Sequence, residues 1–189
     1  LNDNPPAELS DTVSQLEKVE WCDEGYYVTK EIIDGKHPFH IGGCIYFQEP
    51  SAMAVVPALG INPGDYVLDL CAAPGGKSTL ARAALPAGSL LFANEPDRRR
   101  ANILLENIQK QGHPDVVVTN NYPHHYARTK LLFDVILADV PCSGEGLFRR
   151  DPKAVAEWSV TNVQKCATLQ RQIITDIWDR LRPGGLLVY

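Results

Sequence analysis

Short apolar runs that alternate with helical stretches constrain the fold of this chain more than any other feature. Each run has the length of a strand buried on both faces, and the runs occupy residues 66–70, 90–94, 116–119 and 133–139. Stretches with helical periodicity follow the first, second and fourth of them, at residues 77–84, 97–112 and 163–181. Strands that alternate with helices predict a parallel sheet. We therefore expect a doubly wound, Rossmann-like α/β domain over residues 61–189.

The first 60 residues have a different pattern and predict a linker followed by a small appendage. Residues 1–20 predict a linker or fraying helix with little to bury. In residues 21–47, aromatic and β-branched patches are separated by glycines, which is typical of short antiparallel strands joined by glycine turns. Pro50 begins a predicted helix that continues over residues 51–59. We therefore expect residues 21–60 to form a β-rich appendage with one helix.

Charge and cysteine usage narrow the class of protein. The net charge is −5, but residues 1–60 carry ten acidic and three basic side chains, whereas residues 61–189 carry thirteen and fifteen. The second part can therefore still approach a polyanion. Five irregularly spaced cysteines argue against a disulfide framework and for a reducing, cytoplasmic setting. No apolar run approaches the ~18 residues that span a bilayer, so we expect neither a membrane protein nor a membrane partner.

The loop after the first predicted strand is the first candidate binding element. It consists of Cys71, Ala72, Ala73, Pro74, Gly75, Gly76 and Lys77. Small residues let a ligand approach the backbone, and the start of the next helix offers free N–H groups. The plainer interpretation is a tight strand-to-helix turn without a ligand.

The Gly-Lys-Ser sequence at Gly76 also suggests a nucleotide-binding P-loop. That motif requires a glycine five positions earlier, where this chain has Cys71. Residues 133–139 resemble the acidic strand that holds magnesium beside such a loop, so a nucleotide hydrolase or ATP-binding module remains an alternative. A dinucleotide site is less well supported, because the sequence has no G-x-G-x-x-G motif.

The next two strand ends carry an acid and a cysteine. Glu95 lies twenty-six residues after Asp69, close to the ~20-residue offset at which an acid binds both ribose hydroxyls. We therefore expect an adenosine-containing ligand. Asp139 and Cys142 follow the fourth predicted strand, where a thiolate would lie at the ligand-binding edge. Position alone makes Cys142 a candidate nucleophile, whereas Cys44 and Cys166 are typical of core cysteines.

Two motifs carry a family resemblance. Residues 71–77 read CAAPGGK and residues 139–146 read DVPCSGEG, and further matches lie at residues 43–53, 148–152, 158 and 183–189. From about Trp21 to the last residue, the chain resembles the Fmu/Sun family of S-adenosylmethionine-dependent RNA (cytosine-5) methyltransferases. Its RsmF-like branch, which acts on small-subunit ribosomal RNA, is the most similar. An inactive methyltransferase fold that serves as a binding scaffold remains a further alternative.

The resemblance implies a class I methyltransferase sheet, S-adenosylmethionine as cofactor and ribosomal RNA as partner. We also expect a cytoplasmic monomer. Residues 71–77 would hold the methionine part of the cofactor, Glu95 its ribose and Asn121 its adenine, although many members have aspartate at the position of Asn121. Asp139 would border both the cofactor amine and the target cytosine. Lys77, Asp139 and Cys142 would form the catalytic group.

The resemblance also assigns roles to two cysteines. In the family, a thiolate adds to cytosine C6 and so activates C5 for methylation. That thiolate belongs to a Ser-Thr-Cys motif after a Val-Tyr pair, while the Pro-Cys thiol, here Cys142, assists product release. This chain stops at Tyr189 within a predicted strand over residues 186–189, so we expect a catalytic domain truncated before the nucleophile and unable to complete turnover.

The remaining candidates are basic and metal-ligating side chains. Arg149 and Arg150 follow the Cys142 loop and are candidate contacts for RNA phosphate. The basic run at residues 98–100 is more typical of a solvated helix start. His37, His40 and Cys44 are not accompanied by a second cysteine pair, so we expect no metal site.

Overall fold

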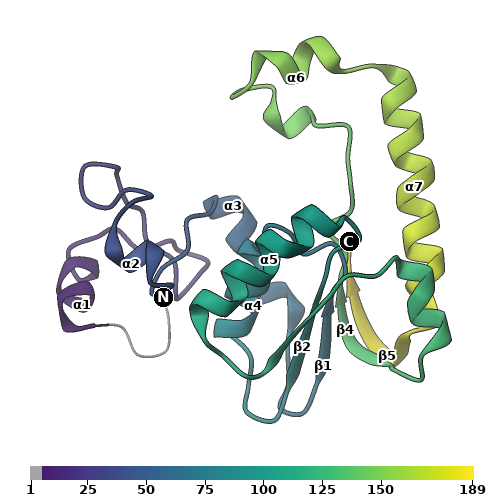
Figure 1. Cartoon of the computed structure of the whole chain (residues 1–189), viewed down its shortest axis with the longest axis horizontal. Helices are drawn as coiled ribbons and strands as arrows, with labels where there is room; N and C mark the ends of the chain where they lie inside the picture. The colour runs from purple at the N-terminus through teal and green to yellow at the C-terminus, as the bar shows by residue number, and fades with distance from the viewer. Residues whose placement is uncertain (1–5) are drawn as a thin grey trace.

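The computed structural model describes residues 6–189 and contains one five-stranded sheet (Figure 1). All neighbouring strands pair in parallel, in the order β3-β2-β1-β4-β5. The strands are β1 Tyr66–Asp69, β2 Leu90–Asn94, β3 Val116–Thr119, β4 Phe133–Leu137 and β5 Leu181–Val188. The strand order reverses between β1 and β4, which is where a doubly wound sheet binds its ligands. The predicted doubly wound fold is confirmed.

Helices cover both faces of the sheet. On one face, α4 (Gly76–Ala83) and α5 (Arg98–Gln111) pack through buried side chains that include Leu80 and Leu104. On the other face, α7 (Val160–Trp178) and the 3₁₀ segment η2 (Pro123–Arg128) pack through Ile173, Ile177 and Tyr126. The central strands β1, β2 and β4 thus lie between two apolar layers, which explains their continuous apolar runs in the sequence, whereas the edge strands β3 and β5 are more exposed.

Local signals fix the ends of the helix that lies closest to the site. The carboxylate of Asp97 caps α5 by accepting a hydrogen bond from the backbone N–H of Arg100 at 2.9 Å. Gly112 ends the helix in the left-handed conformation, with φ +72°. Ser159 caps α7 in the same way, so this helix begins at Val160 rather than at the predicted residue 163.

The prediction of a β-rich appendage is wrong. Within residues 6–60 the structure has no strand, and a single antiparallel bridge joins Lys18 and Tyr26. The segment instead forms four short helical turns, which are α1 Ala7–Val13, α2 Pro38–Ile41, α3 Pro50–Met53 and the 3₁₀ turn η1 Pro57–Leu59. The aromatic and β-branched patches are only two or three residues long, so they pack as a cluster of side chains rather than pairing as strands. Pro57 breaks the helix predicted for residues 51–59 because proline cannot donate to the preceding turn.

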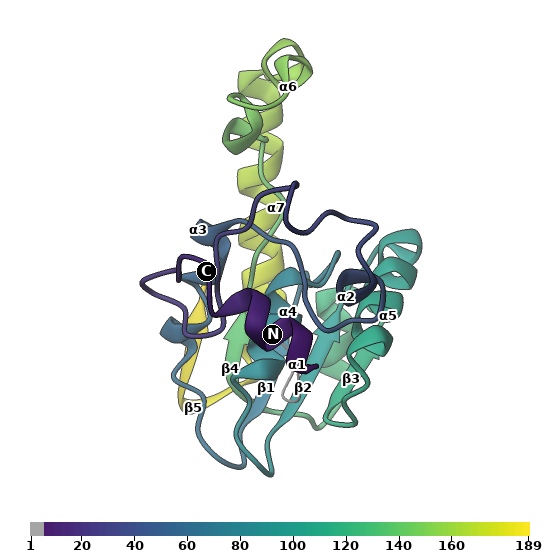
Figure 2. The same ribbon diagram turned by 90° about the vertical axis from the view of Figure 1, so that its left-hand side faces the viewer.

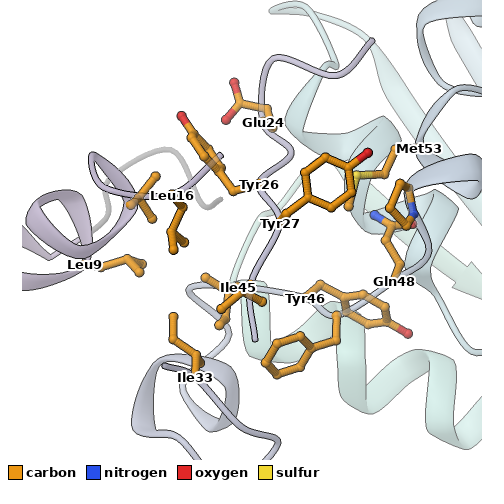
Figure 3. A pocket seen from close by; sticks show the side chains of 14 residues that line it. Leu9, Leu16, Glu24, Tyr26, Tyr27, Ile33, Ile45, Tyr46, Gln48 and Met53 are labelled. Carbon is orange, nitrogen blue, oxygen red and sulfur yellow. The ribbon is translucent and has the colours of Figure 1, made fainter. Parts of the chain in front are cut away.

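The prediction that residues 1–20 have little to bury is also wrong for the described part of this range. Leu9 is fully buried and Val13 nearly so, and both pack against Ile33. An apolar cavity of about 220 Å³ lies beside them, with Leu9, Leu16, Ile33 and Ile45 around it (Figure 3). The appendage therefore has a small core of its own.

An arm projects from the sheet between β4 and α7. It contains the 3₁₀ turn η3 (Glu145–Leu147) and α6 (Pro152–Glu157), and both views show α6 and the start of α7 extending beyond the domain (Figures 1 and 2). Trp158 at the end of α6 donates a hydrogen bond from Nε1 to Glu145 Oε1 at 2.7 Å, which ties the two turns of the arm together. None of the helices in residues 6–189 is long and apolar enough to cross a membrane.

Candidate active site

Two cavities meet at the carboxyl edge of the sheet. The larger, of about 630 Å³, lies between the ends of β2 and β4 and helix α7. The smaller, of about 280 Å³, lies between the loop after β1 and the appendage segment that contains Tyr46 and Gln48. Cys71 and Asp139 line both cavities. The structure therefore brings the three strand ends singled out in the sequence to one continuous site.

The loop of residues 71–77 forms the floor of the smaller cavity. Gly75 has φ +117°, a conformation that side-chain-bearing residues rarely adopt. Gly76 begins α4, and a Cβ there would lie 3.1 Å from Tyr46 Cε1 and 3.2 Å from Gln48 Oε1. The loop therefore needs small residues because the appendage packs closely over it. Tyr46 and Gln48, which sequence reasoning missed as site residues, also lie along the wall of the appendage cavity (Figure 3).

Glu95 lies buried at the end of β2 and lines the larger cavity. Its Oε1 accepts a hydrogen bond from the backbone N–H of Asp97 at 3.0 Å. Its Oε2 is buried and has no hydrogen-bond donor among residues 6–189, although Arg100 Nη1 lies 3.4 Å away. One carboxylate oxygen is thus fixed and the other is left to accept a hydrogen bond from a ligand.

Lys77 and Asp139 form an ion pair where the two cavities meet. Lys77 Nζ donates to Asp139 Oδ2 at 2.6 Å, and the lysine side chain is the more buried of the two. A P-loop lysine must instead reach the phosphates of a bound nucleotide. Because this lysine is held by a carboxylate, the geometry disfavours the P-loop alternative.

Burial changes the acidity of two groups at the end of β1. Burial raises the pKa of Asp69 to about 7, although the hydrogen bond from Ser78 Oγ to Oδ2, at 2.6 Å, acts in the opposite direction. Burial also raises the pKa of the Cys71 thiol to about 12, and Glu95 adds to this shift. Cys71 therefore stays a neutral thiol at physiological pH and is not a nucleophile.

Cys142 lies exposed in the wall of the larger cavity. The preceding residue, Pro141, accepts a hydrogen bond on its carbonyl from Gln170 Nε2 of α7 at 2.9 Å. A proline and a contact with the long helix thus hold the backbone that presents this thiol.

Asn121 is held through its backbone. Its N–H donates to Asn94 Oδ1 at 3.0 Å, and its carbonyl accepts from Asn94 Nδ2 at 2.9 Å. The neighbouring wall of the larger cavity is formed by Tyr122, Pro123 and His124. Asn94 is fully buried and also donates to the carbonyl of Leu70, so one amide side chain fixes the ends of three strands. The sequence predicted Asn94 only as the last residue of the strand over residues 90–94.

Arg149 and Arg150, the two neighbouring arginines of the arm, have different environments. Arg149 is exposed, whereas Arg150 forms an ion pair with Glu49 of the appendage. Glu49 also lines the smaller cavity. The Arg150 guanidinium thus has a carboxylate partner in this structure, which sequence reasoning did not anticipate.

The histidines named as possible metal ligands have structural contacts. His37 Nδ1 accepts the backbone N–H of Phe39 and so caps α2, and His40 packs on the ring of Phe47. Within the described residues no group of three or more histidine, cysteine or acidic side chains could hold a metal ion.

Comparison with known proteins identifies the family to which this site belongs. Residues 56–189 match the family model of the 16S rRNA methyltransferase RsmB/F, and residues 2–50 match that of the N-terminal domain of 16S rRNA methyltransferase RsmF. The chain belongs to the RsmB/F family of 16S rRNA methyltransferases. The RsmB/F match covers every strand of the sheet and all residues of the two predicted motifs.

Curated relatives in this family are much longer than the chain. Ribosomal RNA small subunit methyltransferase F of Enterobacter sp. (strain 638) is 39% identical over 93% of this chain and 38% of its own length. The protein of the same name from Escherichia coli O127:H6 is 38% identical over 92% of this chain and 38% of its own length. The chain thus spans about 38% of these RsmB/F relatives.

Solved structures show the same architecture. A methyltransferase homologue from Pyrococcus horikoshii has a TM-score of 0.80 and 29% identity, and the match covers 96% of this chain and 59% of that chain. NSun6 from Pyrococcus horikoshii, solved with SFG, has a TM-score of 0.75 and 28% identity over 82% of this chain and 40% of that chain. The methyltransferase fold expected for an RsmB/F member is therefore present.

Proposed function

We propose that this chain is the cofactor-binding core of an RNA (cytosine-5) methyltransferase that acts in the cytoplasm, as a monomer, on small-subunit ribosomal RNA. The observation that carries the proposal is the convergence of Glu95, the loop of residues 71–77, Asp139 and Cys142 on one pair of joined cavities. Membership of the RsmB/F family and the printed names of the relatives support the same reaction class.

The residues present fit S-adenosylmethionine. Glu95 offers a buried Oε2 with no donor among residues 6–189, which suits a ribose hydroxyl. Gly76 lines the smaller cavity, and the first N–H groups of α4 suit a carboxylate such as that of methionine. The cofactor supplies an electrophilic methyl group when it is bound. Tyr122, which lines the larger cavity, would border its adenine together with the adjacent Asn121, which is not itself one of the lining residues.

The chain's own groups can hold and move protons beside the target base. Asp139 accepts from Lys77 and faces both cavities, so this pair can exchange a proton with a cytosine ring that enters between them. Cys142 presents an exposed thiol on the same wall. We assign it the family's role of assisting product release, so Lys77, Asp139 and Cys142 form the proposed catalytic group.

A thermal-shift experiment tests the ligand class. S-adenosylhomocysteine should raise the unfolding midpoint, whereas ATP with magnesium should not, because only a ligand that binds the folded state stabilises it. Glu95→Ala should weaken S-adenosylhomocysteine binding by about 1.5–3 kcal/mol, the scale of a lost charge-assisted hydrogen bond. A midpoint raised by ATP with magnesium alone would support the nucleotide-hydrolase alternative and overturn the proposal.

A further inference from the structure

Side chains on one face of α5 hydrogen-bond to backbone carbonyls of the loop of residues 71–77. Arg100 Nη2 donates to the carbonyl of Ala73 at 2.7 Å, and Asn107 Nδ2 donates to the carbonyl of Pro74 at 2.9 Å. Between them, Leu104 Cδ1 lies 3.2 Å from the position of a Cβ on Gly75. These three side chains are four and three residues apart, so they lie on one face of the helix. The conformation of the loop therefore depends on α5 as well as on its own sequence.

Arg100 also contacts the acid at the end of β2. Its Nη1 lies 3.4 Å from Glu95 Oε2, in an ion pair in which the glutamate side chain is 3% exposed and the arginine side chain is 52% exposed. A buried carboxylate needs a nearby countercharge, and Arg100 supplies it from the solvent side. The 3.4 Å between Arg100 Nη1 and Glu95 Oε2 is longer than a typical hydrogen bond between a guanidinium and a carboxylate. Glu95 Oε2 can therefore still accept a hydrogen bond from another donor.

Arg100 contacts Ala73 through Nη2 and Glu95 through Nη1, which are two nitrogens of its rigid, planar guanidinium. The guanidinium therefore sets the separation between the Ala73 carbonyl and the Glu95 carboxylate. These groups belong to the two parts of the site that we assign to the methionine and the ribose of the cofactor. A lysine could reach only one of them, because its ammonium is a single point of charge.

We propose that Arg100 is a positioning residue that couples the loop of residues 71–77 to Glu95 and so strengthens recognition of the cofactor ribose. The inference rests on the proposed function, since it takes Glu95 as the ribose acid. Arg100 acts through the orientation of Glu95 Oε2, and the affinity gained should depend on whether a ribose hydroxyl is present to meet that oxygen.

The test compares two ligands by calorimetric titration of the full-length protein, S-adenosylhomocysteine and its 2′-deoxy analogue. Arg100→Gln should weaken S-adenosylhomocysteine about tenfold, and it should weaken the deoxy analogue about two- to threefold. Arg100→Lys should recover only part of the loss. Arg99→Gln, on the exposed first turn of the same helix, is the matched control and should bind both ligands like the parent.

The outcomes separate the inference from the function on which it rests. If Glu95→Gln binds S-adenosylhomocysteine as tightly as the parent, Glu95 is not the ribose acid and the proposed site fails. If Glu95→Gln weakens binding but Arg100→Gln does not, only the role of Arg100 is overturned. Equal losses for both ligands in a folded Arg100→Gln variant would also overturn it, because they would show a general structural role without coupling to the ribose.

Discussion

Asp69, the last residue of β1, is a buried ionisable side chain that links the sheet to the start of α4. Its Oδ2 accepts from Ser78 of α4, which fixes the start of that helix against β1. Its Oδ1 is buried without a hydrogen-bond partner among the described residues, and Asp69 is one of the residues that line the smaller cavity. Burial raises the pKa of this carboxyl to about 7, so the folded protein favours its neutral form below about pH 7.

This shift predicts a pH dependence of stability. Between about pH 4 and pH 7 the unfolded chain has an ionised aspartate while the folded protein still binds the proton, so the free energy of unfolding should fall as pH rises through this range. The loss should be at most about 4 kcal/mol. Asp69→Asn should remove it, as urea unfolding of both proteins from pH 4.5 to 8 would show. Parallel pH profiles would mean that Asp69 is ionised in the folded state.

Cys142 is the residue for which position and family give different roles. Position favours a nucleophile, whereas the family assigns the Pro-Cys thiol to product release. Under the family role, Cys142→Ser in the full-length protein should accumulate covalent enzyme–RNA adduct, visible as a retarded band on a denaturing gel with substrate RNA and S-adenosylmethionine. Absence of the band together with loss of methyl transfer would make Cys142 the attacking thiol.

At the scale of elements, the turn from β1 into α4 is the most constrained part of the site. Gly75→Ala should lower the unfolding midpoint and weaken S-adenosylhomocysteine binding, because φ +117° is strained for alanine and the new methyl group would press on Leu104. Gly88→Ala is the matched control, since Gly88 has φ +82° before β2 with open space around it. It should lower the midpoint and leave binding unchanged. If Gly75→Ala and Gly88→Ala bind S-adenosylhomocysteine equally well, the loop of residues 71–77 tolerates a side chain at position 75.

The elements also show what the sequence can and cannot predict. The central strands β1, β2 and β4 were predictable because they are buried on both faces. The start of β5 was not, since residues 181–185 are partly or fully exposed and Leu181 fell within the helix predicted for residues 163–181. That Glu95 and Asp139 line one cavity was predictable because parallel strands end at one edge of the sheet. The contacts of Arg100 and Asn107 were not, since they depend on how α5 docks on a loop that lies 27 and 33 residues earlier. The appendage was mispredicted because its short aromatic patches suit a strand or a side-chain cluster equally well.

At the scale of the whole molecule, the appendage and the arm are linked across the smaller cavity. Arg150 of the arm pairs with Glu49, whose segment also supplies Tyr46 and Gln48 to the cavity wall. The appendage is thus part of the site rather than a separate module. An incoming RNA phosphate would have to compete with Glu49 for Arg150.

This competition predicts unequal contributions from the two arginines. Arg149→Gln should reduce the slope of log K against log salt for RNA binding by about 0.7–0.9, the value for one phosphate contact. Arg150→Gln should reduce it less, because Glu49 already neutralises that side chain. Glu49→Gln should raise RNA affinity by freeing Arg150. Filter binding of the full-length protein at several salt concentrations measures all three, and identical slopes throughout would assign the pair to structure alone.

We propose that this site transfers methyl groups to cytosine C5 in small-subunit ribosomal RNA. Nucleoside analysis by mass spectrometry tests it directly, after 16S rRNA from cells lacking the gene is incubated with the full-length protein and S-adenosylmethionine. New 5-methylcytidine should appear with the parent protein, and much less should appear with Glu95→Ala. Methylation of a different nucleoside, or no methylation by a protein that binds S-adenosylhomocysteine, would contradict it.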